Sequence, residues 1–233
     1  MKIGLFALPG LPAGKQNIKD SRLDEVDKFV KAKKKTYVQA ETGKEDACLE
    51  ADAIIVHEDS RADLILKDLE FIETRLSRVE NDIEKALLSK LKAALEKEEF
   101  IFRLELTQDE RKMMSGYGLL TNNPVIVAGK QELEDFNKLL LRAFKESGFI
   151  SFFTAGEKET RAWPIRQGTT AWEAAGAIHS DIQRGFIRAE IISLSDFLQA
   201  GGESQAKQQG KLRLEQKDYI MQDGDLVNFR FNK

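Results

Sequence analysis

The pattern of hydrophobic and polar positions divides the chain near residue 149. Before that point, short apolar runs alternate with long helical stripes; after it, strands and tight turns follow one another. Apolar runs predict strands at residues 2–8, 36–39 and 53–57, and Leu23, Val26 and Val30 predict one buried face of a short helix between the first two. The chain is therefore expected to fold as two domains, residues 1–148 and residues 149–233.

A long helical stripe follows the third predicted strand. Residues 62–99 contain neither glycine nor proline, and the apolar positions Leu69, Ile72, Leu76, Val79 and Ile83 recur at steps of three and four. This spacing predicts either one long helix or a helical hairpin that turns near residues 81–82. Either form is a helical insertion at about residues 62–120, and we interpret its stripe as packing rather than a binding face.

The end of the first domain carries helix and strand signals. Thr107 and Glu110 have the spacing of a capping box, which predicts a helix start. A strand is expected at residues 124–128, and a helix at residues 133–146 that ends at Gly148. Beyond it, we expect a helix at residues 171–181, packed through Trp172, Ala175 and Ile178, and two short strands joined through the turn sequence QDGD.

Composition and charge narrow the function classes. The 233 residues include 36 Lys and Arg against 39 Asp and Glu, so a net charge of -3 gives no global attraction to nucleic acid. The single cysteine, Cys48, cannot form an internal disulfide, which fits a reducing compartment. No apolar run reaches the roughly 20 residues that span a bilayer, and the first one is broken by Pro9. We therefore expect a cytoplasmic protein that binds no membrane.

The stretch ALPGLPAGKQN, residues 7–17, has the outline of a damaged phosphate-binding loop. An intact loop, G-x-x-x-x-G-K-[ST], wraps phosphates with backbone N–H groups, reaches them with its lysine and holds Mg²⁺ with its hydroxyl. Here Gly14 and Lys15 supply the second glycine and the lysine, and Gln16 replaces the hydroxyl residue. Either Pro9 stands where the first glycine belongs, or Ala7 does and the loop is two residues longer; the phosphate cradle is broken in both alignments. We interpret Lys15 as a solvated loop lysine.

The two histidines do not form a second candidate site. His57 follows a predicted strand and His179 lies in the later helix, too far apart in sequence to indicate a metal site or a proton relay. Structural roles are expected for both, and no metal.

Two long segments carry a family resemblance. GFISFFTAGEKETRAWPIRQGTTAWEAAGAIHSDIQRGFIRAEII and GKLRLEQKDYIMQDGDLVNFRFN are similar to the C-terminal TGS domain of the YchF family, which are Obg-related nucleotide-hydrolysing GTPases. The earlier segments DSRLDEVDKFVKAKKK, ADLILKDLEFIETRL and YGLLTNNPVIVAG resemble the same family, more weakly and in the same order. The resemblance implies an α/β remnant of a P-loop G domain with a helical arm, followed by an α+β β-grasp (ubiquitin-like) TGS domain.

Other nucleotide-binding elements of that family are altered here. Glu41 lies close to where the aspartate of a magnesium-side D-x-x-G belongs, and the base-reading N-x-x-E has become residues 129–132, which keep Glu132 and lose the asparagine. The last base-side loop is missing. We therefore expect no cofactor and no hydrolysis; GTP or ATP with Mg²⁺ is expected only if the loop has been rebuilt.

The function predicted is binding rather than catalysis. TGS domains of this family are associated with RNA or with regulatory contacts, so RNA or the ribosome, or a protein, is the expected partner, and DNA is not. If cations lie on one sheet face near Trp163 or Phe186, phosphates can meet them while a base stacks on the ring. The candidates are Lys158, Arg161, Arg166, Arg184, Arg188, Lys211 and Arg213. Two alternatives stay open: a divergent nucleotide-binding protein with a rebuilt phosphate loop, and an adaptor that uses the helical arm.

Overall fold

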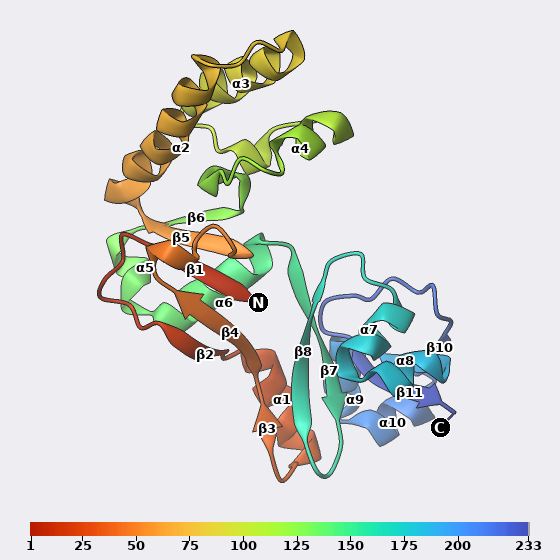
Figure 1. The fold of residues 1–233 in the computed structure, drawn as a ribbon. Helices are drawn as coiled ribbons and strands as arrows, with labels where there is room; N and C mark the ends of the chain where they lie inside the picture. Colours follow the sequence, from red (N-terminus) through yellow and green to blue (C-terminus); the bar gives the residue numbers. More distant parts are fainter. Residues whose placement is uncertain (233) are drawn as a thin grey trace. The chain divides into compact units, whose positions relative to one another are not determined.

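The computed structural model describes residues 1–232 and divides them into two compact units (Figure 1). The first unit contains residues 1–16 and 40–147, and the second contains residues 17–39 and everything from Gly148 onward. The chain therefore enters the second unit twice, at residues 17–39 and again at Gly148. Residues 17–39, expected in the first domain, instead belong to the second unit.

The first unit is built on a five-stranded sheet with the order β2-β4-β1-β5-β6. Strands β4, β1, β5 and β6 are parallel to one another. Its strands are β1 (Lys2–Phe6), β2 (Gly14–Ile18), β4 (Val38–Gly43), β5 (Ala53–His57) and β6 (Val125–Ala128). Its remaining short elements are η1 (Glu45–Ala47), η2 (Glu58–Ser60), η3 (Ile101–Arg103), η4 (Leu120–Asn122), α5 (Lys130–Glu134) and α6 (Phe136–Glu146).

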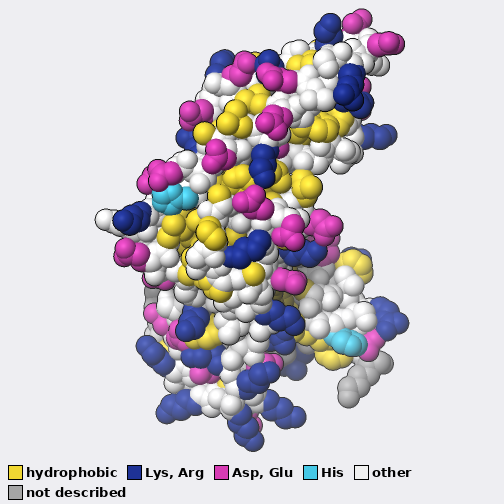
Figure 2. Space-filling view, turned by 60° about the vertical axis from the view of Figure 1, so that its left-hand side comes forward, with side chains coloured by type: hydrophobic (Ala, Val, Ile, Leu, Met, Phe, Trp, Pro, Cys, Tyr) yellow, Lys and Arg dark blue, Asp and Glu magenta, His cyan; other side chains and the backbone are white. Residues whose placement is uncertain are grey.

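The helical insertion is a hairpin rather than one long helix. Helix α2 (Arg61–Leu76) and helix α3 (Asp82–Leu95) are separated by a turn whose last residue, Asn81, caps α3 by accepting hydrogen bonds from two backbone N–H groups. Of the expected stripe, Ile72 is buried with Leu64, Leu87 and Leu91 in a core shared with α4 (Gln108–Met114), and Leu69, Leu76 and Val79 pack against that core. Ile83 is 71% exposed, so the expectation that it packs is wrong. The capping box of Thr107 and Glu110 is also present. Some apolar side chains of this arm stay exposed in its upper part (Figure 2).

A buried carboxylate fixes the arm to the segment that leads into β6. Asp68 on α2 is 2% exposed and accepts hydrogen bonds from the backbone N–H groups of Leu120 (2.8 Å) and Thr121 (2.7 Å). The Thr121 hydroxyl donates a third bond, 2.6 Å long. One side chain therefore satisfies three donors that have no solvent to replace it.

The second unit is built on a six-stranded mixed sheet with the order β10-β9-β11-β7-β8-β3. Its strands are β3 (Lys35–Thr36), β7 (Phe149–Ala155), β8 (Thr160–Arg166), β9 (Phe186–Ile192), β10 (Arg213–Glu215) and β11 (Leu226–Phe231). Its helices are α1 (Ser21–Val30), α7 (Ala171–Ile178), α8 (Ser180–Arg184), α9 (Leu194–Ala200) and α10 (Glu203–Gln208). Strands β10 and β11 both pair with β9, so the QDGD turn does not join a hairpin as expected.

Helix α1 joins this unit because its apolar face is buried there. Leu23 and Val26 are fully buried, and the ring of Phe29 meets that of Phe197 on α9 edge to face at 5.8 Å. Arg22 pairs with Asp20 at 2.7 Å and with Asp223 of the QDGD turn at 2.8 Å. These contacts lie far apart in the sequence, so local periodicity alone could not assign the helix to the second unit.

Helix α7 covers the other face of the same sheet, but not through all the residues expected. Ala171, Ala174 and Ala175 are fully buried, and Ile178 packs against the same core, whereas Trp172 is 44% exposed. The buried positions follow the i, i+3, i+4, i+7 spacing, which places Trp172 at the border of the apolar face. The expectation that Trp172 packs on the sheet is therefore wrong.

Candidate functional site

The stretch that resembles a phosphate loop ends in a strand instead of a helix. Residues 14–18 form β2, an edge strand that the sequence pattern had not indicated, and Lys15 on it is exposed. In a working phosphate loop, the glycine and lysine open a helix whose N-terminal N–H groups face the anion. Gly14 and Lys15 therefore lack the helix start that would hold a phosphate.

A lysine from another segment is bound by the loop. The ammonium group of Lys44 donates hydrogen bonds to the carbonyl oxygens of Leu8 (3.3 Å), Pro9 (3.2 Å) and Leu11 (2.6 Å). Nearby, the Thr42 hydroxyl lies within hydrogen-bond distance of the carbonyl oxygens of Pro12 (2.8 Å) and Gly14 (3.0 Å). The loop thus presents carbonyl oxygens to a cation, whereas a phosphate-binding loop presents N–H donors to an anion. Sequence reasoning missed Lys44, because no motif links it to a loop more than thirty residues earlier.

A small cavity of about 470 Å³ adjoins the loop. It is lined by Ala7, Leu8, Pro9, Gly10, Leu11, His57, Asp59, Ser60 and Leu133. None of these lining residues is a lysine or arginine, and Asp59 contributes a carboxylate. A phosphate placed here would meet the negative charge of Asp59, and the nearby ammonium of Lys44 is already bound by the loop carbonyls.

Glu132, which the sequence suggested as the remnant of a base-reading motif, already has hydrogen-bond and ion-pair partners. One carboxylate oxygen accepts the backbone N–H of Gly129 at 3.1 Å, and the other pairs with Arg142 at 2.7 Å. The hydrogen bond from Gly129 and the charge of Arg142 hold the pKa of Glu132 below its usual range. Glu132 acts here as a helix cap.

The seven cations proposed for RNA binding do not share one face. Arg161 lies on the α7 side of β8 with Trp163, whereas Arg166 points to the opposite side, over the ring of Phe149 at 3.8 Å. Arg188 alternates with the buried residues Ala189 and Ile191 on β9, which places it on that opposite side as well. Lys158 and Arg161 lie in the β7–β8 turn and at the start of β8, respectively.

Three of the remaining candidates are paired with local carboxylates. Arg184 pairs with Asp181, and Lys211 with Asp196 at 3.1 Å. Arg213 lies near Glu215 and Asp225 and donates to the hydroxyl of Tyr219. The ring of Phe186 packs against Phe229 in the core.

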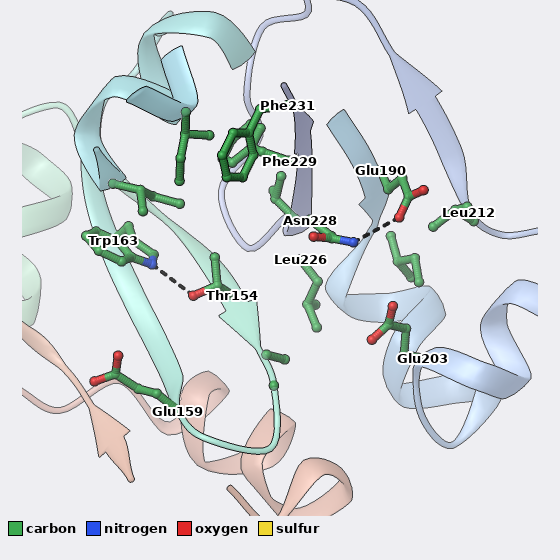
Figure 3. Close-up of a pocket in the computed structure, with 16 residues that line it drawn as sticks. Thr154, Glu159, Trp163, Glu190, Glu203, Leu212, Leu226, Asn228, Phe229 and Phe231 are labelled. Carbon is green, nitrogen blue, oxygen red and sulfur yellow. Dashed lines mark hydrogen bonds between the residues drawn. The ribbon is translucent and has the colours of Figure 1, made fainter. Parts of the chain in front are cut away.

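A second cavity, of about 440 Å³, lies where β7 and β11 separate (Figure 3). These parallel strands pair only at Phe153 and Leu226. The indole of Trp163 forms one wall and donates to the Thr154 hydroxyl at 2.9 Å, while Asn228 on the other side donates to Glu190 at 3.0 Å (Figure 3). The rings of Phe229 and Phe231 also line it. The cavity therefore combines aromatic walls with a few polar groups, the usual composition of a small-ligand site.

The histidines have structural roles in the described part of the chain. Nδ1 of His57 accepts the N–H of Asp59 at 3.2 Å, and Nδ1 of His179 accepts that of Asp181 at 3.1 Å, so each caps a short helix. Residues 1–232 contain no cluster of three potential metal ligands. Among the same residues, no helix combines the length and apolar character needed to cross a membrane.

Cys48 should be unreactive in the folded protein. Its side chain is fully buried, and burial together with the charge of Glu45 raises the pKa of the thiol to about 11. Because the thiolate is the reactive form, iodoacetamide at pH 8 should label the native protein far more slowly than the guanidinium-unfolded protein. Mass spectrometry over a time course measures both rates; equal rates would contradict this assignment.

Comparisons with known proteins find similarity to YchF proteins. Residues 149–232 match the family model YchF-GTPase_C, described as a protein of unknown function (DUF933). The chain is 33% identical over 235 aligned positions to the ribosome-binding ATPase YchF of Bacillus subtilis, covering 73% of this chain and 64% of that protein. It is 35% identical to the Pasteurella multocida protein of the same name, covering 64% of this chain and 56% of the relative. The chain thus spans about three fifths of the length of these relatives.

A solved structure shares the fold. The Schizosaccharomyces pombe YchF GTPase superposes with a TM-score of 0.73, at 18% identity, over 99% of this chain and 97% of that one. The mixed α/β arrangement of both sheets is therefore that of a known structure. The chain is similar to the YchF proteins over much of its length, and residues 149–232 match the model of their C-terminal family.

Proposed function

We propose that this chain associates with the ribosome through RNA and does not hydrolyse nucleotide. The relatives in Bacillus subtilis and Pasteurella multocida are named for both ribosome binding and ATPase activity. The family model matches residues 149–232, which supply strands β7 to β11 of the second sheet, whereas the nucleotide elements are altered. Ribosome association is thus the property that this chain keeps.

The contact between Lys44 and the loop carbonyls carries the proposal. Phosphoryl transfer requires loop amides, a lysine and Mg²⁺ to act together on the phosphates. In this chain, the loop holds the ammonium of Lys44, Lys15 is exposed on an edge strand, and Gln16 offers no hydroxyl for Mg²⁺. A nucleotide would have to displace Lys44 and reverse the loop before it could bind.

The C-terminal unit is assigned by the same proposal as a TGS domain with a β-grasp fold. Its mixed sheet is crossed by α7 on one face, and the parallel pair β7 and β11 lies near the centre. These features agree with the segments that resemble the TGS domain of the family. Such a domain is the part through which we expect RNA contact.

Sedimentation with ribosomes tests this function. The purified protein should pellet with ribosomes at low salt and be released as salt rises from roughly 50 to 200 mM, because phosphate contacts weaken with salt. ATP, GTP and Mg²⁺ should change neither the pelleted fraction nor the melting temperature. A nucleotide at 100 times its Kd would stabilise the fold by about 2.7 kcal/mol, which a thermal melt detects.

The Lys15→Ala variant provides the matched control. It should behave as the wild type in sedimentation, because Lys15 has no role in the proposed contact. Mg²⁺-dependent turnover that Lys15→Ala abolishes would show instead that the loop is a rebuilt phosphate site. A chain that never pellets with ribosomes would leave protein contact through the arm as the remaining function.

A further inference from the structure

An unpaired group of cations lies at the β3 edge of the second unit. The α1–β3 connection runs beside the β7–β8 turn: the N–H of Lys33 donates to the carbonyl of Glu157 at 3.0 Å, and that of Thr160 to the carbonyl of Lys34 at 2.9 Å. Lys31, Lys33 and Lys158 are therefore brought together from two segments far apart in sequence. With Arg161 we call them the basic edge. Figure 2 shows lysines and arginines gathered at the lower end, the level of these two turns in Figure 1.

Most carboxylates near the basic edge already have hydrogen-bond or ion-pair partners outside it. Glu159 pairs with Lys34 at 3.1 Å and accepts from Thr36, while Asp24 pairs with Lys35. Asp27 accepts from the backbone of Ala32, and Glu157 is exposed beside the edge. Within residues 1–232, Lys31, Lys33 and Lys158 are exposed and form no ion pair. Their ammonium groups are free to meet anions from solution.

Arg161 of the basic edge packs on the ring of Trp163. The guanidinium of Arg161 stacks over the ring of Trp163 at 3.9 Å, and Arg161 forms no ion pair within the described residues. A guanidinium held flat on an indole is a surface on which a nucleobase can stack. The two groups come from alternate positions of β8, so the strand fixes their spacing.

The aromatic cavity opens beside this surface. Gly156 and Glu159, which flank Lys158 in the turn, line the cavity together with Trp163, Asn228 and Phe229 (Figure 3). Its volume of about 440 Å³ exceeds that of a single base. Its carboxylates Glu159, Glu190 and Glu203 disfavour a phosphate inside, although each is already paired with a cation of the same unit.

We propose that the basic edge binds single-stranded RNA, with phosphates on Lys31, Lys33 and Lys158 and an unstacked base beside Arg161 and Trp163. This assignment rests on the proposed function and names the contact that would carry it. The distribution of charge favours this orientation, since the free cations lie outside the cavity and the rings line it. Double-stranded RNA offers the same phosphates but no splayed base, so the edge should prefer the single strand.

Charge reversal tests the phosphate contact. The variant Lys31→Glu/Lys33→Glu/Lys158→Glu should bind a fluorescein-labelled single-stranded RNA 12-mer at least tenfold more weakly than wild type in anisotropy titrations. Its slope of log affinity against log salt should fall by about 2, because three phosphate contacts to a single strand are lost. The matched control Lys85→Glu/Lys97→Glu/Lys217→Glu changes the net charge equally at exposed lysines elsewhere and should bind as wild type.

Tryptophan emission tests the base contact. In a Trp172→Phe background, Trp163 is the remaining tryptophan, and saturating single-stranded RNA should quench its emission whereas inorganic tripolyphosphate should not. Unchanged emission at saturation, equal affinity for the matched duplex, or equal RNA affinity of the two triple variants would overturn the assignment. If wild type and the edge variant pellet equally with ribosomes, ribosome association stands and this contact is wrong. If wild type does not pellet at all, the proposed function itself fails.

Discussion

Replacing Asp68 with alanine should destabilise the first unit by about 3 kcal/mol, because two buried N–H groups and one hydroxyl lose their only acceptor. Removing a partner from a buried group costs more than the net value of the bond itself. Chemical denaturation followed by circular dichroism gives the change in the free energy of unfolding. The helical arm should loosen first, since Asp68 joins α2 to the segment before β6.

The Thr121→Val variant is the control for this prediction. It removes only the hydroxyl bond to Asp68 and keeps the side-chain shape, so the expected cost is about 1 kcal/mol. Asp68→Asn should lie between the two, because an amide has one oxygen to accept and also brings two donors toward the N–H groups. Equal costs for Asp68→Ala and Thr121→Val would show that the backbone bonds contribute nothing.

Gly4→Ala should cost about 2 to 3 kcal/mol through overpacking of the central strand. A Cβ at Gly4 would lie 2.6 Å from Sγ and 2.9 Å from Cα of Cys48, which is fully buried. The clash with Cα involves backbone, so a change of rotamer cannot relieve it. Thermal and denaturant unfolding should both show the loss.

Gly116→Ala is the matched substitution without a clash. A Cβ there meets no atom within 4 Å, and the residue's φ does not require glycine, so the change should be close to neutral. The double variant Gly4→Ala/Cys48→Ala removes the sulfur contact and should recover part of the loss, but not the part due to Cα. Full recovery would mean that the backbone of Cys48 yields easily.

Elements governed by local pattern could be predicted from the sequence. Strand β5 occupies the expected residues, Thr107 begins a capped helix, and most of the stripe that begins at Leu69 packs in a helical hairpin, although Ile83 is exposed. In each, a short periodic stretch or cap determines the result. Trp172 shows the limit of predicting burial from helical spacing. It directly follows the buried Ala171, yet its own side chain is exposed.

Features decided by distant contacts could not be predicted. Strand β2 contains the polar residues Lys15, Gln16 and Asn17, which have no strand-like alternation of apolar residues; its pairing depends on β4. Lys44, which directly follows β4, donates hydrogen bonds to the carbonyls of the loop. The backbone N–H of Lys33 donates to the carbonyl of Glu157 in the β7–β8 turn. The cations chosen from the C-terminal sequence alone therefore missed the lysines that accompany Lys158.

The excursion of residues 17–39 has a consequence for how the protein is made. The segment is synthesised early, but the strand β8 and helix α9 that cover it come only after residue 148. During translation the first unit can close around β1, β4 and β5 while α1 still lacks its partners, with Leu23 and Val26 uncovered. The apolar face of α1 therefore stays exposed on the nascent chain until the last third of the protein has been synthesised. A fragment that begins at residue 149 would lack α1 and leave its packing surface uncovered.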